Sequence, residues 1–231
     1  PVLESRPTEP VGPGVNRESR APIPGRPTWL ESSASRHTPK GYEGLVLKGR
    51  ESSGLIGELD GLQALANCPD PSQVILDGGL GPHTSASAAA LGAAGVLVVG
   101  QHLACPELSI PLSLRWRLRC ADDELTCVVQ GIRVGNSPTA PVLLRLAMGE
   151  DPWTLADGIW EDGDLQNRLW LMGQGAGLAV GLVERHGNLP GLLQAYRHHW
   201  LHFRSLAAKS QPSDTKRPVF TSRSLNSGTA A

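Results

Sequence analysis

The chain has 231 residues and a formal net charge of −1, so no excess of basic residues points to a nucleic-acid partner. No apolar run approaches the length of a membrane span and no secretory signal pattern is present, so we expect a cytoplasmic protein that binds neither nucleic acid nor membrane. The four cysteines form no CxxC pair and are expected to be reduced thiols.

The two ends of the chain are predicted to be disordered. Residues 1–40 are dense in Pro, Gly, Ser, Glu and Arg and show no hydrophobic period, so they cannot bury enough apolar surface to offset the entropy of ordering. The same composition predicts a disordered tail at 209–231. The chain opens with Pro1, which favours a processed protein or a piece of a longer one.

Short apolar runs alternate with segments of helical spacing between residues 41 and 105. The runs GLVLK (44–48), QVIL (73–76) and GVLVV (95–99) are typical of strands that are buried on both faces. Strand, helix, strand, helix and strand at this short spacing predict parallel β-α-β units.

The regularity falls beyond residue 105, and residues 106–208 are predicted to form a mostly helical extension. Residues 112–120 and 125–134 fit two strands, or a helix and a strand, and the pattern leaves both open. Residues 165–187 are predicted to be helical with a break around 173–177, and 189–208 an amphipathic helix. The apolar side of that last helix is expected to carry Leu192, Leu193, Tyr196, Trp200 and Phe203.

Glycines follow the second and third predicted strands. Asp77-Gly78-Gly79-Leu80-Gly81 comes after one strand and Gly100-Gln101 after the next. Ligands of parallel α/β proteins bind outside the carboxyl ends of the strands, where glycine lets backbone amides approach an anion closely. Glycine spacing alone fits a phosphate site and ordinary tight turns equally well.

Two segments of the chain resemble the nitronate monooxygenase (2-nitropropane dioxygenase) family, which includes flavin-dependent enoyl-acyl carrier protein reductases. GLVLKGRESSGLIGE (44–58) is similar to the "KGNEAGGxxGE" loop of members linked to polyketide and polyunsaturated fatty acid synthases. VILDGGLGPHTSASAAALGAAGVLVVGQHL (74–103) is similar to their "GGIGxHTAAAxxAAGAAGVVLDxQL" block. A weaker likeness, to "PLGQDAAFAAxLAxRxxTVGGxLQAxR", covers WLMGQGAGLAVGLVERHGNLPGLLQAYR (170–197).

The resemblance implies an α/β fold: the C-terminal part of a TIM-type (β/α)8 barrel with parallel strands, followed by the helical extension. In this family FMN binds with its phosphate on the loops after the last two strands. The three predicted strands would then be strands six, seven and eight. The resemblance assigns the phosphate to Gly78, Gly79, Gly100 and Gln101, and the loop beside the isoalloxazine ring to Gly49 and Gly54.

The chain departs from the family in two respects. Three strands cannot close an eight-stranded barrel, so we expect the C-terminal portion of a larger protein, a shortened relic, or a half completed by a partner chain. Glu51-Ser52-Ser53-Gly54-Leu55 stands where many relatives have Glu-Ala-Gly-Gly-His, whose His is the proton-handling residue in several members. Leu55 cannot move a proton, so no catalytic residue is assigned and ordinary nitronate oxidation is not expected.

Three further side chains follow or precede the glycine loops. His83 fits either a phosphate contact or a helix-entry residue in solvent. Asp77 fits a ribityl hydroxyl or a turn, and Lys48 fits a flavin contact or, as we favour, a solvated strand end.

A metal site is not expected. His198 and His202 have the i, i+4 spacing of metal ligands on a helix, with His199 between them. Because no acidic third ligand is nearby in the sequence, a solvated helix face is favoured.

Two functions remain open on the sequence. The first is the FMN-binding portion of a flavin-dependent oxidoreductase tied to polyketide or fatty acid synthesis, acting on a small-molecule or acyl-carrier-bound substrate beside other synthase domains. The alternative is a non-catalytic, truncated barrel that serves as a docking or spacer module.

Overall fold

A computed structural model describes residues 27–120 and 126–210 of the chain. The predicted disorder of residues 1–26 and 211–231 falls outside the described residues, as do residues 121–125. The described residues form two β-sheets, one parallel and one antiparallel.

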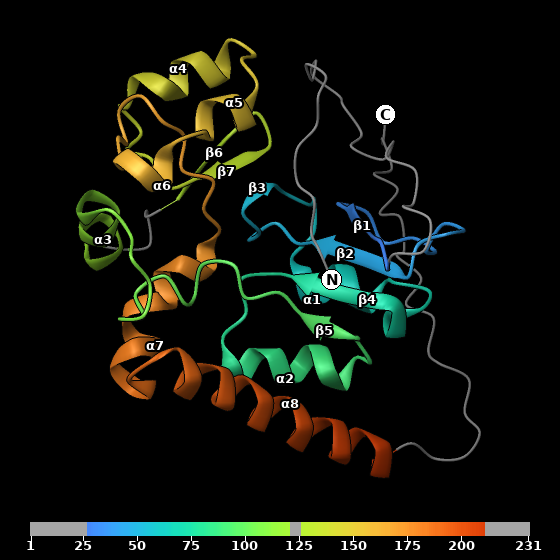
Figure 1. Cartoon of the computed structure of the whole chain (residues 1–231). Coiled ribbons are helices and arrows are strands. Elements are labelled where there is room, and N and C mark those ends of the chain that lie inside the picture. Colours follow the sequence, from blue (N-terminus) through green and yellow to red (C-terminus); the bar gives the residue numbers. More distant parts are fainter. Residues whose placement is uncertain (1–26, 121–125, 211–231) are drawn as a thin grey trace, which may run out of the picture.

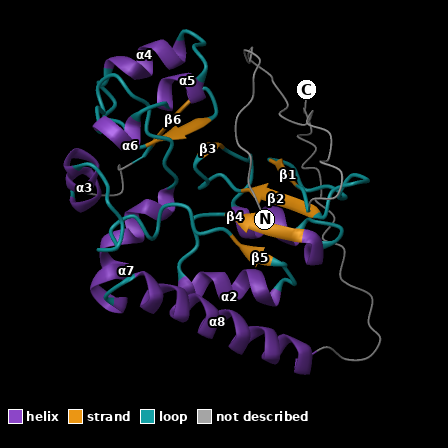
Figure 2. Ribbon diagram, viewed as in Figure 1, coloured by secondary structure: helices purple, strands orange, loops and turns teal. Residues whose placement is uncertain are grey.

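The four-stranded parallel sheet forms the centre of the larger lobe (Figures 1 and 2). Its order is β1-β2-β4-β5, and each neighbouring pair is parallel. This confirms the parallel pairing predicted for the three apolar runs, although β5 is shorter than the predicted strand 95–99. The strands are β1 (Trp29–Ser32), β2 (Gly44–Lys48), β4 (Val74–Asp77) and β5 (Gly95–Val96).

Strand β1 corrects the prediction that residues 1–40 are a disordered leader. Trp29–Ser32 pairs in parallel with β2, and Leu30 is only 6% exposed because it packs into the same core as Leu45. The composition of the whole segment is that of a linker, but two adjacent apolar residues suffice to add a strand to a sheet that is already formed. The order of a short strand of this kind is decided by tertiary contacts and not by composition.

Helices cover one face of this sheet. Leu45, Leu47 and Leu76 are fully buried beneath α1 (Gly61–Ala66), which lies between β2 and β4 in the sequence. The short 3₁₀ helix η1 (Pro71–Gln73) precedes β4, and α2 (Pro82–Ala90) follows it. Most of the buried residues of α2 are alanines, and this small surface lets the long helix α8 (Leu189–Ser210) pack along it (Figure 1).

The second lobe is built around a small antiparallel sheet of order β3-β7-β6. Most of the ordered elements between residues 106 and 208 are helices, as predicted, but the hairpin β6–β7 was not. The structure also resolves what the pattern left open: residues 112–119 are a helix, while 127–134 are a hairpin. The core of this lobe is lined by residues such as Val142 and Leu169. The strands are β3 (Gly54–Leu55), β6 (Cys127–Val129) and β7 (Ile132–Val134); the helices are α3 (Leu112–Arg119), α4 (Pro141–Ala147), α5 (Pro152–Ala156) and α6 (Ile159–Asp162).

The chain then returns to the larger lobe. The predicted break around 173–177 is the 3₁₀ helix η2 (Gln174–Leu178), which leads into α7 (Ala179–His186) and α8. The amphipathic helix predicted at 189–208 is confirmed as α8, with Leu192 and Tyr196 buried. Its apolar face is narrower than predicted, because Leu193 is 48% exposed and Phe203 is 39% exposed.

Two further features of the fold concern membrane-spanning helices and the state of the cysteines. Within the described ranges, no helix is both long and apolar enough to cross a membrane. All four cysteines are free thiols, of which Cys68 and Cys105 are buried.

The narrow apolar face of α8 gives a direct test of its docking. Leu192→Ala removes a fully buried side chain, so we expect the free energy of unfolding to fall by about 2 to 4 kcal/mol. Leu193→Ala, one residue away on the exposed side, is the matched control and should change it by less than about 0.5 kcal/mol. Urea denaturation followed by circular dichroism measures both, and equal losses would show that α8 packs in another orientation.

Candidate functional site

The candidate site lies at the carboxyl edge of the parallel sheet, where the loops after β2, β4 and β5 come together. These loops hold five of the six residues that the resemblance assigns to a cofactor, and the sixth, Gly54, lies in β3, which follows the first loop. A fourth segment, residues 173–176, reaches the same place from the far end of the chain. This meeting of four loops is the feature around which the other side chains are arranged.

Lys48 is the buried cation of the site. It ends β2 opposite Asp77 at the end of β4, and its Nζ lies 2.9 Å from Asp77 Oδ2 and 3.5 Å from Glu31 Oε1. The same ammonium donates a hydrogen bond of 2.7 Å to the carbonyl of Ser53. At 6% exposed, Lys48 is not the solvated strand end that the sequence favoured, because the parallel register gives it a buried carboxylate partner.

Asp77 is buried with its charge compensated. It is 3% exposed, and this burial raises the pKa of its carboxyl above the ordinary value, while the Lys48 ammonium opposes the rise. The backbone carbonyl of Asp77 accepts hydrogen bonds from the amide of Gly49 and from Ser52 Oγ. Asp77 therefore does more than form a turn, since it joins the ends of two strands and the loop between them.

The loop after β2 is held by several independent contacts. The amide of Gly49 donates to Asp77 O and to Ser52 Oγ, each at 2.9 Å. A Cβ at Gly49 would lie 2.6 Å from the backbone of Gly61, so the loop passes directly against α1. Arg133, on β7, donates to the carbonyl of Arg50 from Nε and Nη2 at 3.1 and 3.0 Å, which ties the loop to the second lobe.

The end of this loop enters the second lobe. Gly54 and Leu55 form β3 and pair with β7, so Leu55 lies opposite Ile132. Leu55 packs, half-buried, against the core of that lobe. Position 55, which the sequence resemblance aligns with a proton-handling His, is therefore part of a hydrophobic core here, and Gly54 is in the same strand.

The loop after β4 presents backbone donors that have no partner. Among the described residues, the amides of Gly78, Gly79 and Leu80 donate no hydrogen bond. Gly79 has a positive φ of 62°, a conformation that side chains other than glycine adopt only with strain. Adjacent unbonded amides just before the first turn of α2 are the donor set that an anion requires.

Residues 173–176 are the part of the site to which the sequence analysis assigned no role. A Cβ at Gly79 would lie 3.0 Å from the amide nitrogen of Gly175, and one at Gly100 would lie 2.9 Å from Ala176 Cβ. A Cβ at Gly173 would likewise lie 2.9 Å from Glu51 O, and the amide of Gln174 donates to that carbonyl at 2.9 Å. The segment thus contacts all three strand-end loops. Its glycines fall in the weaker of the resembling segments, the one signal that pointed to it.

Gln101 binds protein groups from its buried position. Its Oε1 accepts the amides of Val99 and Gly100 at 3.0 Å each, and its Nε2 donates to Leu80 O at 2.9 Å. Tyr196 Oη donates to the same Leu80 carbonyl at 2.6 Å. Gln101 therefore joins the loops after β4 and β5, and its assignment to the phosphate, like that of Gly100, stays a prediction.

The histidines lie beside the site, on its helical side. His83, in the first turn of α2, has its ring centroid 4.0 Å from that of His199 on α8. His198 and His202 are stacked with centroids 6.3 Å apart. Among the described residues, no group of three or more His, Cys, Asp or Glu side chains is arranged to hold a metal ion.

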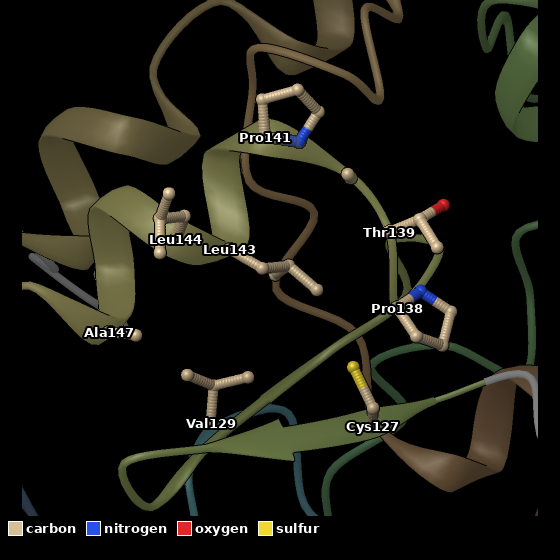
Figure 3. Close-up of a pocket in the computed structure, with 9 residues that line it drawn as sticks. Cys127, Val129, Pro138, Thr139, Pro141, Leu143, Leu144 and Ala147 are labelled. Atoms are coloured by element: carbon tan, nitrogen blue, oxygen red, sulfur yellow. The ribbon is translucent and has the colours of Figure 1, made fainter.

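A cavity of about 610 Å³ lies elsewhere, in the second lobe. Figure 3 shows Cys127 and Val129 of β6 facing Leu143 and Leu144 of α4 across it. Its lining is mostly apolar and contains none of the residues of the carboxyl edge. The cavity is therefore separate from the candidate site.

Comparisons with known proteins agree on the fold. No protein-family profile and no curated protein matches the chain. The solved structure of FabK from Thermotoga maritima is 21% identical with a TM-score of 0.52, and the match covers 72% of this chain and 58% of that one. Its M276A mutant is 23% identical with a TM-score of 0.52, over 72% of this chain and 56% of that one. The nitroalkane oxidase from Streptomyces ansochromogenes is 19% identical with a TM-score of 0.52, over 79% of this chain and 60% of that one.

At these identities the likeness shows the fold alone: a mixed α/β structure whose parallel sheet is of the TIM-barrel kind. The chain spans less than two thirds of the length of the structures that it matches. Its sheet has four parallel strands among the described residues, and those strands do not close into a barrel.

The buried ion pair predicts a pH-dependent loss of stability. Lys48→Met leaves Asp77 buried and unpaired, so we expect unfolding to become easier by about 3 to 5 kcal/mol at neutral pH. The folded pKa of Asp77 is raised, so the folded state binds a proton more readily than the unfolded state and stability falls as pH rises between the two pKa values. Because the variant loses the cation that opposes this rise, its deficit should shrink at mildly acidic pH.

Urea unfolding of both proteins at neutral and at mildly acidic pH measures this difference. Arg145→Met is the control, because it breaks the exposed Arg145–Glu150 pair and should change stability far less at either pH. A deficit of Lys48→Met that does not depend on pH would contradict the assignment of Asp77 as its buried partner.

Proposed function

We propose that this chain is the FMN-binding part of a flavin-dependent oxidoreductase of the enoyl reductase or nitronate monooxygenase kind. The observation that carries the proposal is the set of unbonded amides at Gly78 and Gly79, at the carboxyl end of β4 and against the glycine segment 173–176. The sequence resemblance, which covers the same loops, and the fold shared with FabK and nitroalkane oxidase support it.

The residues present fit a phosphate monoester. The amides of Gly78 and Gly79 would donate to its oxygens, and the amide of Gly175, which also donates no hydrogen bond among the described residues, lies close to Gly79. Gly100 and Gln101 would support these donors without contacting the phosphate, since their own polar groups are bonded to protein. FMN, when bound, would supply the hydride or oxygen chemistry of the reaction.

The chain's own residues would fix the environment of the flavin ring. The loop 49–53, which the resemblance places beside the ring, is held by Lys48, Asp77 and Arg133. This fixes its backbone and places a compensated cation at the carboxyl edge. No ionisable side chain stands at position 55, so proton transfer to a substrate would have to come from another group.

The substrate class and partners are part of the proposal and rest on the sequence resemblance. A small molecule or an acyl group on a carrier protein would be the substrate, with other domains of a polyketide or fatty acid synthase as partners. The non-catalytic alternative, a docking or spacer module, is favoured by one observation, the packing of Leu55 into the core of the second lobe.

Flavin binding tests the proposal directly. In Gly79→Ala the added methyl group meets the Gly175 amide, so we expect the affinity for FMN to fall on the order of tenfold to a hundredfold. Gly131→Ala is the matched control: its φ of 76° is also positive but nothing lies within 4 Å, so it carries similar backbone strain and should bind FMN as the parent does. Quenching of flavin fluorescence measures both affinities. If Gly79→Ala and the parent bind FMN with equal affinity, the assignment of the phosphate to this loop is wrong.

The leucine at position 55 leads to a second expectation, that the chain does not catalyse nitronate oxidation. General acid–base catalysis contributes about 10² to 10⁴-fold in rate, and a leucine that packs in a core cannot provide it. With added FMN and a simple alkyl nitronate, this chain should consume oxygen no faster than free flavin. Turnover well above that background would mean that another side chain handles the proton.

A further inference from the structure

The parallel sheet ends on two open edges. β1 pairs only with β2, and β5 pairs only with β4, among the described residues. The two edge strands lie on opposite sides of the sheet and point in the same direction (Figure 1). An open edge presents a row of unpaired amides and carbonyls, which readily pair with another strand.

The strand β5 is shorter than its sequence allows. The apolar run extends from Gly95 to Val99, but only Gly95 and Val96 are in the ladder, and the amide of Leu97 adds one more bond to Leu76 O. Because backbone groups alternate between the two sides of a strand, the amide of Val98 points away from β4. A strand added at this edge would extend β5 over the remainder of the run.

One face of the sheet also lacks a covering helix. Leu30, Leu45 and Leu76 point toward the helical layer and belong to its core. Side chains alternate along a strand, so Trp29, Val46, Ile75 and Leu97 point to the opposite face. Val46, on the central strand β2, is buried, whereas the other three are only half-buried. In a closed barrel this face would be the filled interior.

We propose that two copies of this chain pair edge to edge, β5 of each beside β1 of the other, and so close a single eight-stranded barrel. A twofold axis through the barrel makes both contacts identical and parallel. Twice four strands is the number at which parallel α/β barrels close with a packed interior. The net charge of −1 per chain opposes the association only weakly.

The pairing itself is argued from the sheet, and only its effect on flavin binding rests on the proposed function. With one copy, the side chain of Glu31, beside Lys48 at the carboxyl edge, remains 36% exposed. The partner copy would cover this part of the site and exclude water from the flavin ring.

The test uses the full chain, with and without FMN, in size-exclusion chromatography with light scattering at about 1 to about 100 μM. We expect a mass of twice 24.5 kDa. Val98→Pro, which removes an edge donor without breaking the β4–β5 ladder, and Leu97→Glu, which places a charge on the open face, should each halve that mass. Met148→Glu, at a residue 80% exposed in the second lobe, should leave it unchanged. Far-UV circular dichroism verifies that each variant is folded.

Four results separate the possibilities. A monomeric parent at every concentration, or a dimer that survives both edge variants, would overturn the inference. A monomer that binds FMN would overturn it and leave the proposed function standing. A dimer sensitive to both edge variants that binds no FMN would support the pairing and contradict the proposed function.

Discussion

The arrangement at the carboxyl edge depends on backbone-to-backbone contact between the segment 173–176 and three loops that follow different strands. A Cβ added at Gly79, Gly100 or Gly173 would lie only 2.9 to 3.0 Å from atoms of the facing segment, so these positions favour glycine. The segment carries the chain from the second lobe back to α7 and α8, so the same contact fixes how the two lobes join. Replacing any of these glycines would move a loop, and with it the strand end or the helix to which that loop is attached.

Charge adds a second constraint at the same edge. A lysine and an aspartate at the ends of adjacent parallel strands are brought together by register, and burial makes each depend on the other. The lysine extends this dependence to the loop by bonding Ser53 O, and Ser52 extends it to the carbonyl of Asp77. The loop 49–53 is thus bonded to the ends of both β2 and β4 before any ligand binds, which is the condition for a preorganised site.

The sequence predicted the parallel strands and the helix α8 because their apolar patterns are strong enough to survive in any tertiary context. It missed β1, whose two apolar residues lie in a segment with the composition of a linker, and it placed the exposed Leu193 on the buried side of α8. Glycines could be found by their spacing after strands, but the contact of Gly175 with Gly79 joins residues almost a hundred positions apart. No local pattern encodes such a pair, and the burial of Lys48 likewise depends on a partner strand.

The glycines of the site are alike in the sequence, but the structure separates them by what their amides do. The amide of Gly49 bonds to Asp77 and Ser52, and that of Gly100 bonds to Gln101, so the need for glycine at these two positions is explained by packing within the protein. The amides of Gly78 and Gly79 have no such partner among the described residues. A backbone donor without a partner in a tightly packed loop is costly unless an acceptor arrives from outside, and it is this difference, more than the number of glycines, that favours a bound anion.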